Sequence, residues 1–331
     1  MVPFDPHKRP TTTALTAAVM VSLLLGVPGS AHAQDAYPTR PITFVVAFAA
    51  GGVADATARI LGQSLGQQFG QTVVIENRGG AGGNLAARMV SRSPADGYTV
   101  LITTTSIAIN ETLYKNKGYE TETLTPVAIV ASTPDVLAVH ASNPAKSLPD
   151  FIKAAKDKPI TFGSAGVGSP SFVAATYFFK VLAKVDATHV PFQGGAPAVN
   201  AAVGNNLDMI AISLPSVAPQ ITQGALKGLG IAAPKRSVTL PDVPTYTEVG
   251  FPNFYSDSWM SVFVPANTDP AIVTKLNAAI QTALREPAVA DRLSKLGFNV
   301  ILNSSAEAAA MFKSEVKKWG DMVKAVDLKI Q

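Results

Sequence analysis

The chain has 331 residues, of which 47% are hydrophobic and 15% charged, and its formal net charge is +4. This length and apolar content suffice for a sizeable core in one large or two medium domains. The sequence contains no cysteine, which excludes disulfides, thiol catalysis, thiolate metal sites and a lipid-modified cysteine anchor. No basic patch with interleaved aromatic residues is visible, so nucleic acid binding is not predicted; the mild positive charge fits an anionic small ligand without requiring one.

Residues 1–33 have the pattern of a signal peptide. Two basic residues precede an apolar run at 15–27, and Ala31-His32-Ala33 forms a small-x-small cleavage site. We expect export to a periplasm-like space and a mature chain that begins at Gln34. The alternative is a retained N-terminal anchor, but the run is short for a membrane span, and no later stretch approaches about 18 uninterrupted apolar residues.

The first elements alternate between strands and helices. A continuous apolar run at 41–48 predicts a parallel strand covered on both faces. In chain order, we then expect a helix at 53–69 closed by Gly70, a strand at 73–76, a helix at 85–92 and a strand at 98–103. This order implies right-handed crossovers and an open α/β sheet.

The same order recurs in the second half of the chain. It predicts a strand from Ile160, a helix at 172–184, a strand at 188–192, a helix opened by a small-residue turn and ending near Gly204, and a strand at 207–212. Two α/β lobes that face each other, with a ligand between them, are therefore expected.

Two apolar segments, 136–139 and 259–264, are candidates for joining the lobes. The first lobe would then be discontinuous, with residues 34–135 and 259–331, and the second would comprise residues 136–258. Helices expected at 269–286, 287–296 and 305–326 would complete the first lobe.

Three loops after predicted strands, at 48–54, 164–171 and 193–197, consist largely of small residues. Helix N-termini carry unpaired N–H groups and partial positive charge, and glycine lets a ligand approach the backbone closely. The loops are therefore candidate carboxylate cradles, with serine hydroxyls as further donors. The alternative is that they are ordinary tight turns, but three of one kind favour a binding role.

Several polar side chains are open to two interpretations. Asp55 can cap the first turn of its helix, which we favour, or meet a ligand cation or water. Asp208, beside a buried-looking strand, is either a structural hydrogen-bond hub or a ligand contact. The hydroxyls at 103–106 point either to the cleft or to solvent.

Enzyme signatures are weak. The stretch 166–171 approaches a dinucleotide fingerprint but lacks its third glycine, and no phosphate loop or nucleophile elbow is present. His140 and His189, the histidines after residue 33, have no metal-ligand spacing, and we interpret both as structural. Ser164 or Asp208 without a nearby histidine is a poor catalytic centre, so we predict no enzyme activity, cofactor or metal.

Several motifs together carry a family resemblance. They are YPTRPI at 37–42, FAAGG at 48–52 with Asp55, VIENRGGAGGN at 74–84, DGYT at 96–99, GSAGVGS at 163–169, THVPF at 188–192, KRS at 235–237, LPDVPT at 240–245 and the segment around Trp259. In this order and spacing, from about residue 37 to 329, the chain resembles the Bug-type extracytoplasmic receptors of tripartite tricarboxylate transporters.

The resemblance implies an α/β, two-lobed periplasmic-binding-protein fold, in which each lobe is an open, mostly parallel sheet flanked by helices and two crossover segments form the hinge. It implies a monomer that captures a small di- or tricarboxylate, aliphatic or aromatic, and delivers it to membrane permease subunits. A sensor for a membrane kinase and, less favoured, an exported carboxylate-processing enzyme are the alternatives. The expected ligand-binding residues are Phe48, Ala49, Gly51, Gly52, Asp55, Thr105, Ser106, Ser164, Ala165, Gly166, Gly168, Ser169, Phe192, Gly194, Gly195, Ala196 and Asp208.

Two departures from the family pattern are expected to matter. Ala47 and Ala50 stand where proline is more common, which makes the first loop less rigid. The segment 211–213 reads Ala-Ile-Ser where a polar or acidic group is often seen, so the distal pocket would be more apolar and suited to an aromatic or longer-chain dicarboxylate.

Overall fold

A computed structural model describes residues 1, 37–252 and 254–330. The predicted signal peptide therefore lies, apart from Met1, outside the described residues. The chain divides into two units, Met1–Thr39 and Arg40–Gln331, and every element below belongs to the second unit. No helix in the described part of the chain combines the length and apolar character needed to cross a bilayer.

The first lobe is built on three parallel strands. β1 (Ile42–Val46) lies between β2 (Val73–Asn77) and β3 (Thr99–Thr104). All its residues except Thr43 are buried, as predicted for a strand covered on both faces. The crossovers contain α2 (Val53–Phe69) and α3 (Asn84–Ser91), and a short 3-10 turn (Ala81–Gly83) precedes α3. The predicted order of these elements is confirmed.

The strand β4 (Leu124–His140) connects the two lobes. Up to Pro134 it pairs antiparallel with β9 (Asp257–Pro265), and from Asp135 it pairs antiparallel with β7 (Met209–Ser213). It also pairs with β8 (Leu226–Ile231) and with the short β10 (Asn299–Val300). Because β9 also pairs with β3, one sheet continues through both lobes.

The second lobe repeats the arrangement around β5 (Ile160–Ser164), which is parallel to both β6 (Ala187–Pro191) and β7. Its helices are α5 (Leu148–Ala155), α6 (Pro170–Tyr177), α7 (Gly195–Val203) and α8 (Leu214–Thr222). The helix predicted at 172–184 is α-helical only to Tyr177. It continues as a π-helical segment, Phe178–Ala183, in which two neighbouring phenylalanine side chains are both buried.

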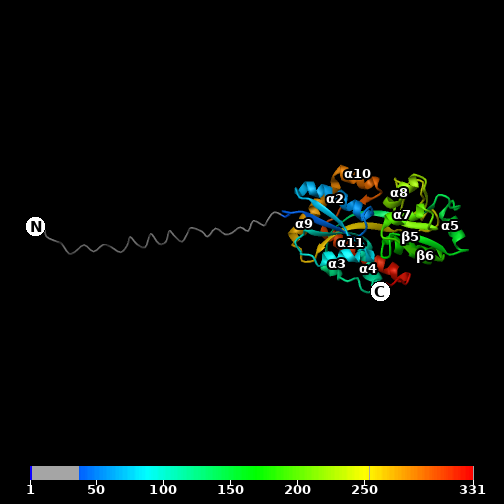
Figure 1. Ribbon diagram of the computed structural model, residues 1–331, viewed down its shortest axis with the longest axis horizontal. Coiled ribbons are helices and arrows are strands. Elements are labelled where there is room, and N and C mark those ends of the chain that lie inside the picture. The colour runs from blue at the N-terminus through cyan, green and yellow to red at the C-terminus, as the bar shows by residue number, and fades with distance from the viewer. Residues whose placement is uncertain (2–36, 253, 331) are drawn as a thin grey trace. The chain divides into compact units, whose positions relative to one another are not determined.

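The remaining helices are α4 (Ser106–Leu113), α9 (Pro270–Arg285), α10 (Pro287–Lys295) and α11 (Ser305–Ala325), with a 3-10 turn at Thr121–Thr123. Figure 1 shows α2, α9 and α10 together at one end of the sheet and α5, α7 and α8 at the other. α11 contacts α4, β4 and α6. One hydrophobic cluster accordingly joins side chains of α4 and α11 to those of α6. The strand order is β2-β1-β3-β9-β4-β7-β5-β6, which gives the two-lobed α/β fold expected from the sequence.

Candidate functional site

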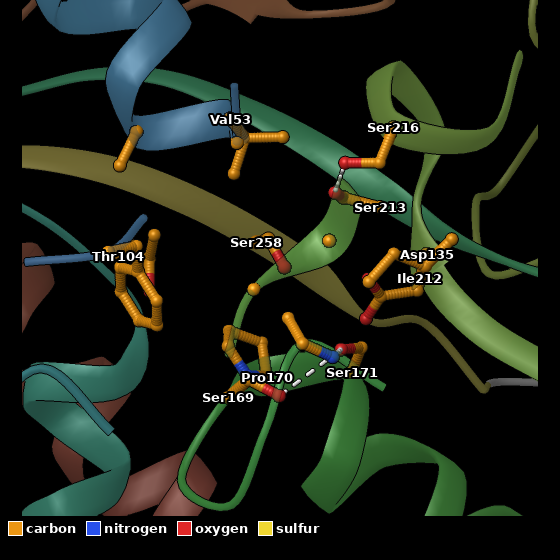
Figure 2. A pocket seen from close by; sticks show the side chains of 16 residues that line it. Val53, Thr104, Asp135, Ser169, Pro170, Ser171, Ile212, Ser213, Ser216 and Ser258 are labelled. Atoms are coloured by element: carbon orange, nitrogen blue, oxygen red, sulfur yellow. Dashed lines mark hydrogen bonds between the residues drawn. The ribbon is translucent and has the colours of Figure 1, made fainter. Parts of the chain in front are cut away.

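A pocket lies where β1, β3, β5 and β7 end. The carboxyl ends of parallel strands are where ligands bind in open α/β sheets. Sixteen residues line it, and Figure 2 shows them from close by: Phe48, Gly52, Val53, Ala54, Thr104, Asp135, Ala165, Ser169, Pro170, Ser171, Gly194, Gly195, Ile212, Ser213, Ser216 and Ser258. Both lobes contribute to the wall.

Four helices begin at this pocket: α2, α6, α7 and α8. The first N–H groups of a helix have no intrahelical partner, and the helix dipole places partial positive charge there. Gly52 and Gly194, at the N-cap positions of α2 and α7, have no side chain with which to cap these groups. The backbone at these two helix starts is therefore free to bind an anion.

The lining residues include no lysine, arginine or histidine, and their one ionisable side chain is Asp135. Hydroxyl groups of Thr104 and five serines also line the wall, of which Thr104 and Ser169 already donate to Ser106 Oγ and to the Gly166 carbonyl. Helix termini and hydroxyls, rather than basic side chains, thus determine the electrostatics of the pocket. Such a site suits a small anion that approaches the backbone closely.

Asp55 stabilises the loop between β1 and α2 by hydrogen bonding. Its Oδ2 accepts hydrogen bonds from the Gly51 N–H and from Arg59 Nε, both at 3.0 Å. Burial opposes ionisation of this carboxyl group, but the bonds from Arg59 and Gly51 outweigh it and lower its pKa. Asn77 Nδ2 also donates to the Phe48 carbonyl at 3.0 Å. Asp55 therefore supports the loop that precedes α2, and it does not cap the first turn, because Gly51 lies before the N-cap residue Gly52.

The loop after β5 is held by Ser164. Its Oγ lies 2.7 Å from His189 Nε2 and accepts from the Gly166 N–H at 3.2 Å. The expectation that no histidine lies near Ser164 is wrong, because the pairing of β5 with β6 brings the two together. Ser164 is nevertheless 0% exposed and does not line the pocket. Burial lowers the pKa of His189 to about 4, so its imidazole is neutral at physiological pH.

The structure brings many of the predicted ligand-binding residues together. Phe48, Gly52, Ala165, Ser169, Gly194 and Gly195 line the pocket. An adjoining pocket shares Phe48 and Ala165 and adds Ala49, Gly166 and Phe192. The loops predicted as carboxylate cradles thus meet at one place.

Other predicted residues lie behind the pocket wall. Thr105 Oγ1 accepts from the Trp259 N–H at 2.9 Å, and Ser106 Oγ lies within 3.5 Å of the Thr103 and Thr104 hydroxyls. Trp259, from one of the motifs of the family resemblance, is buried in the core of the first lobe. Ala196 is exposed and does not line either of these two pockets.

Asp208 lies just before β7, at the end of the strand opposite to the pocket. Its Oδ2 accepts from the Thr161 N–H at 2.8 Å and from Thr161 Oγ1 at 2.9 Å, and Lys158 Nζ is 3.8 Å from Oδ1. This geometry matches the structural alternative, in which Asp208 joins β7 to β5.

The glycine-rich loops of the two lobes contact each other beside the pocket. A Cβ atom at Gly168 would lie 2.8 Å from Asn110 Oδ1 and 3.3 Å from Gly82 Cα, and one at Gly82 would lie 2.9 Å from the Val167 carbonyl oxygen. Gly82 and Gly168 also have positive φ, 62° and 82°. Glycine is therefore required at both positions for sterics and for backbone conformation.

Sequence reasoning missed most of the serines and the acidic residue of the wall. Asp135, Ser213, Ser216 and Ser258 lie at or near points where strands change partners or end. One signal was available, since Asp135 is a lone carboxylate within a long apolar strand. Among the described residues, no cluster of three or more His, Asp or Glu side chains is arranged to hold a metal ion.

Comparison with known proteins gives a consistent picture. Residues 57–328 match the family model described as the tripartite tricarboxylate transporter family receptor. The structure of the periplasmic binding protein BugD is 33% identical with a TM-score of 0.84, over 89% of this chain and 100% of BugD. An R. palustris protein solved with adipate is 31% identical (TM-score 0.85; 89% and 100% covered). MatC from Rhodopseudomonas palustris with bound malate is 33% identical (TM-score 0.81; 87% and 100% covered).

Proposed function

Because this chain belongs to the tripartite tricarboxylate transporter receptor family and is a periplasmic solute-binding protein, we propose that its solute is a small carboxylate enclosed between the two lobes. The observation that carries this proposal is the convergence of four helix N-termini on a pocket whose lining has no basic side chain. Two similar structures hold adipate and malate, which are both dicarboxylates.

The carboxylate binds where the two uncapped helix starts face the pocket. The backbone at Gly52–Ala54 and at Gly194–Gly195 supplies N–H donors, and Ser171 adds a hydroxyl, while the Ser169 hydroxyl holds its own loop by donating to the Gly166 carbonyl at 2.7 Å. Phe48 and Ile212 provide apolar contacts for the carbon chain or ring. A small ligand held in this way reaches micromolar affinity, about 8 kcal/mol of binding free energy.

Closure involves the two lobes that the sequence suggested, residues 34–135 with 259–331, and residues 136–258. The change of β4 from pairing with β9 at Pro134 to pairing with β7 at Asp135 supports this boundary. A second connection runs beside it, where the Asp135 N–H donates to the Ser256 carbonyl at 3.2 Å. The hinge lies at these two crossings.

The exported, monomeric protein delivers its ligand to the permease subunits of the transporter. Proteins of this family and the similar structures are binding proteins, and the full burial of Ser164 gives a bound carboxylate no nucleophile at the Ser164–His189 pair. We therefore propose no turnover. A role as a sensor differs only in the partner, and a ligand-dependent pull-down with permease or kinase periplasmic domains separates the two.

The test is a thermal-shift screen of the chain from Gln34 onward, refolded from denaturant to remove any bound ligand. Mono-, di- and tricarboxylates, aliphatic and aromatic, are compared with amino acids, nicotinate and the methyl ester of each acid. A ligand at 100 times its Kd stabilises the native state by about 2.7 kcal/mol, which raises the midpoint by several degrees. A shift with a carboxylate but not with its ester supports the proposal, and no shift with any carboxylate overturns it.

A further inference from the structure

Asp135 is the acidic residue in the wall of the pocket. It belongs to β4 at the point where this strand changes partners, and its side chain is 6% exposed. Oδ2 accepts a hydrogen bond from Ser256 Oγ at 2.7 Å, whereas Oδ1 has no hydrogen-bond partner among the described residues. Figure 2 shows the carboxyl group among the serine side chains of the pocket wall.

A buried carboxyl oxygen without a partner is costly unless a ligand or a proton satisfies it. No cation in the lining compensates Asp135. The titratable groups that act on it are Asp257 on β9 and Tyr246, while Lys318 and Glu315 of α11 act on Asp257. Burial, reinforced by Asp257 and opposed by the hydroxyl groups of Ser256 and Ser258, raises the pKa of Asp135 to about 7.

The pocket wall combines two chemically different features, the helix starts and Asp135, which pairs across the sheet with Ser213, the N-cap residue of α8. The backbone N–H groups at Gly52–Ala54 and Gly194–Gly195 attract a carboxylate, but Asp135 presents an acceptor to whatever part of the ligand reaches it. A second ionised carboxylate there would face a carboxyl group with no cation between them, which is unfavourable in a buried site. A hydroxyl or amide N–H would instead satisfy Oδ1.

We propose that Asp135 selects the ligand group that contacts it, so that the pocket prefers a carboxylate that also carries a hydrogen-bond donor over the dicarboxylate of equal length. This inference rests on the proposed function, because it assumes that a carboxylate occupies the helix starts. Dicarboxylates then bind with uptake of one proton, shared between Asp135 and the second carboxyl group.

The experiment is calorimetric titration with matched ligands: dicarboxylates of four to six carbons, and the ω-hydroxy acid and monoamide of each. At pH 8 the wild-type protein should bind the better donor ligand about tenfold more tightly than the matched dicarboxylate. Dicarboxylate binding should strengthen as the pH is lowered to 6, with net proton uptake measured in buffers of different ionisation enthalpy.

Asp135→Asn should abolish the preference and the proton uptake, because the amide presents both a donor and an acceptor and does not titrate. Asp135→Ala should also abolish both, and Asp208→Asn, a carboxyl group outside the pocket, should leave both unchanged. Equal binding of donor ligands and dicarboxylates by the wild type at pH 8, or a preference that survives in both Asp135 variants, overturns the inference. If no carboxylate binds the wild type at all, the proposed function fails instead.

Discussion

The contact between Gly168 and Asn110 allows a specific test of lobe closure. In Gly168→Ala, the new Cβ would lie 2.8 Å from Asn110 Oδ1. Asn110 cannot easily move away, because it is buried and its Nδ2 donates to the Gly82 carbonyl at 3.0 Å and to Asn84 Oδ1 at 2.8 Å. The substitution should therefore oppose the approach of the two loops.

Two costs can be separated. The positive φ of 82° at Gly168 disfavours alanine by about 1–2 kcal/mol, whether the lobes are open or closed. The steric contact with Asn110 applies only when the loops meet, and overpacking of this kind costs about 1–3 kcal/mol. The ligand affinity of Gly168→Ala should therefore fall by roughly 5- to 150-fold, and that of Gly168→Val by more.

Gly224→Ala is the matched control. Gly224 has a similar φ of 76°, but a Cβ there meets nothing within 4 Å. Both variants should lose similar unfolding free energy in denaturant titrations, whereas only Gly168→Ala should lose affinity by calorimetry. Wild-type affinity in a folded Gly168→Ala protein would refute this account of closure.

Three further predictions concern other parts of the fold. Asp55→Ala removes the acceptor for the Gly51 N–H and should cost about 1–2 kcal/mol of unfolding free energy, with weaker ligand binding. Because the pKa of Asp55 is lowered on folding, the difference in stability between wild type and variant should shrink as the pH falls below about 4. A difference that does not depend on pH would contradict the role of the Asp55 charge. The indole N–H groups of Trp259 and Trp319 both donate to Glu315 Oε2 at 2.9 Å, and Glu315→Ala removes this acceptor. We expect a loss of about 1–3 kcal/mol of unfolding free energy for each N–H group, measured by denaturation followed by the fluorescence of these two tryptophans. An unchanged midpoint would show that the bonds contribute little. The pKa of Asp135 rises on folding to about 7, so the folded state binds a proton more tightly than the unfolded state. The stability of the ligand-free wild type should therefore decrease as the pH rises from about 4 to 7. Asp135→Asn should flatten this dependence in melting curves, and identical pH profiles for the wild type and the variant would exclude a raised pKa.

Local sequence patterns predict most of the elements because their signals lie within a few residues. The helical spacing that ends at Gly70 gives α2 with the expected ends, and the apolar run at 41–48 contains the shorter strand β1 (Ile42–Val46). The two segments proposed to join the lobes, 136–139 and 259–264, lie within β4 and β9, beside the point at Pro134 and Asp135 where β4 changes partners. Glycine-rich loops after strands likewise indicated where the pocket lies.

What the sequence does not predict depends on pairing between distant strands. Ser164 and His189 are 25 residues apart and meet only through the pairing of β5 with β6. Asp135 reaches the pocket because β4 changes partners at that residue. Asp208 belongs to a strand that leads to the pocket but lies at its other end, a distinction that requires the direction of each strand in the sheet.

The most direct measurement is a crystal structure of the chain with the carboxylate that gives the largest thermal shift. We expect carboxylate oxygens within hydrogen-bond distance of the backbone N–H groups at Gly52–Ala54 and Gly194–Gly195, with both lobes in contact with the ligand. A carboxylate bound elsewhere, or held by lysine or arginine side chains while these helix starts face only water, would contradict this expectation.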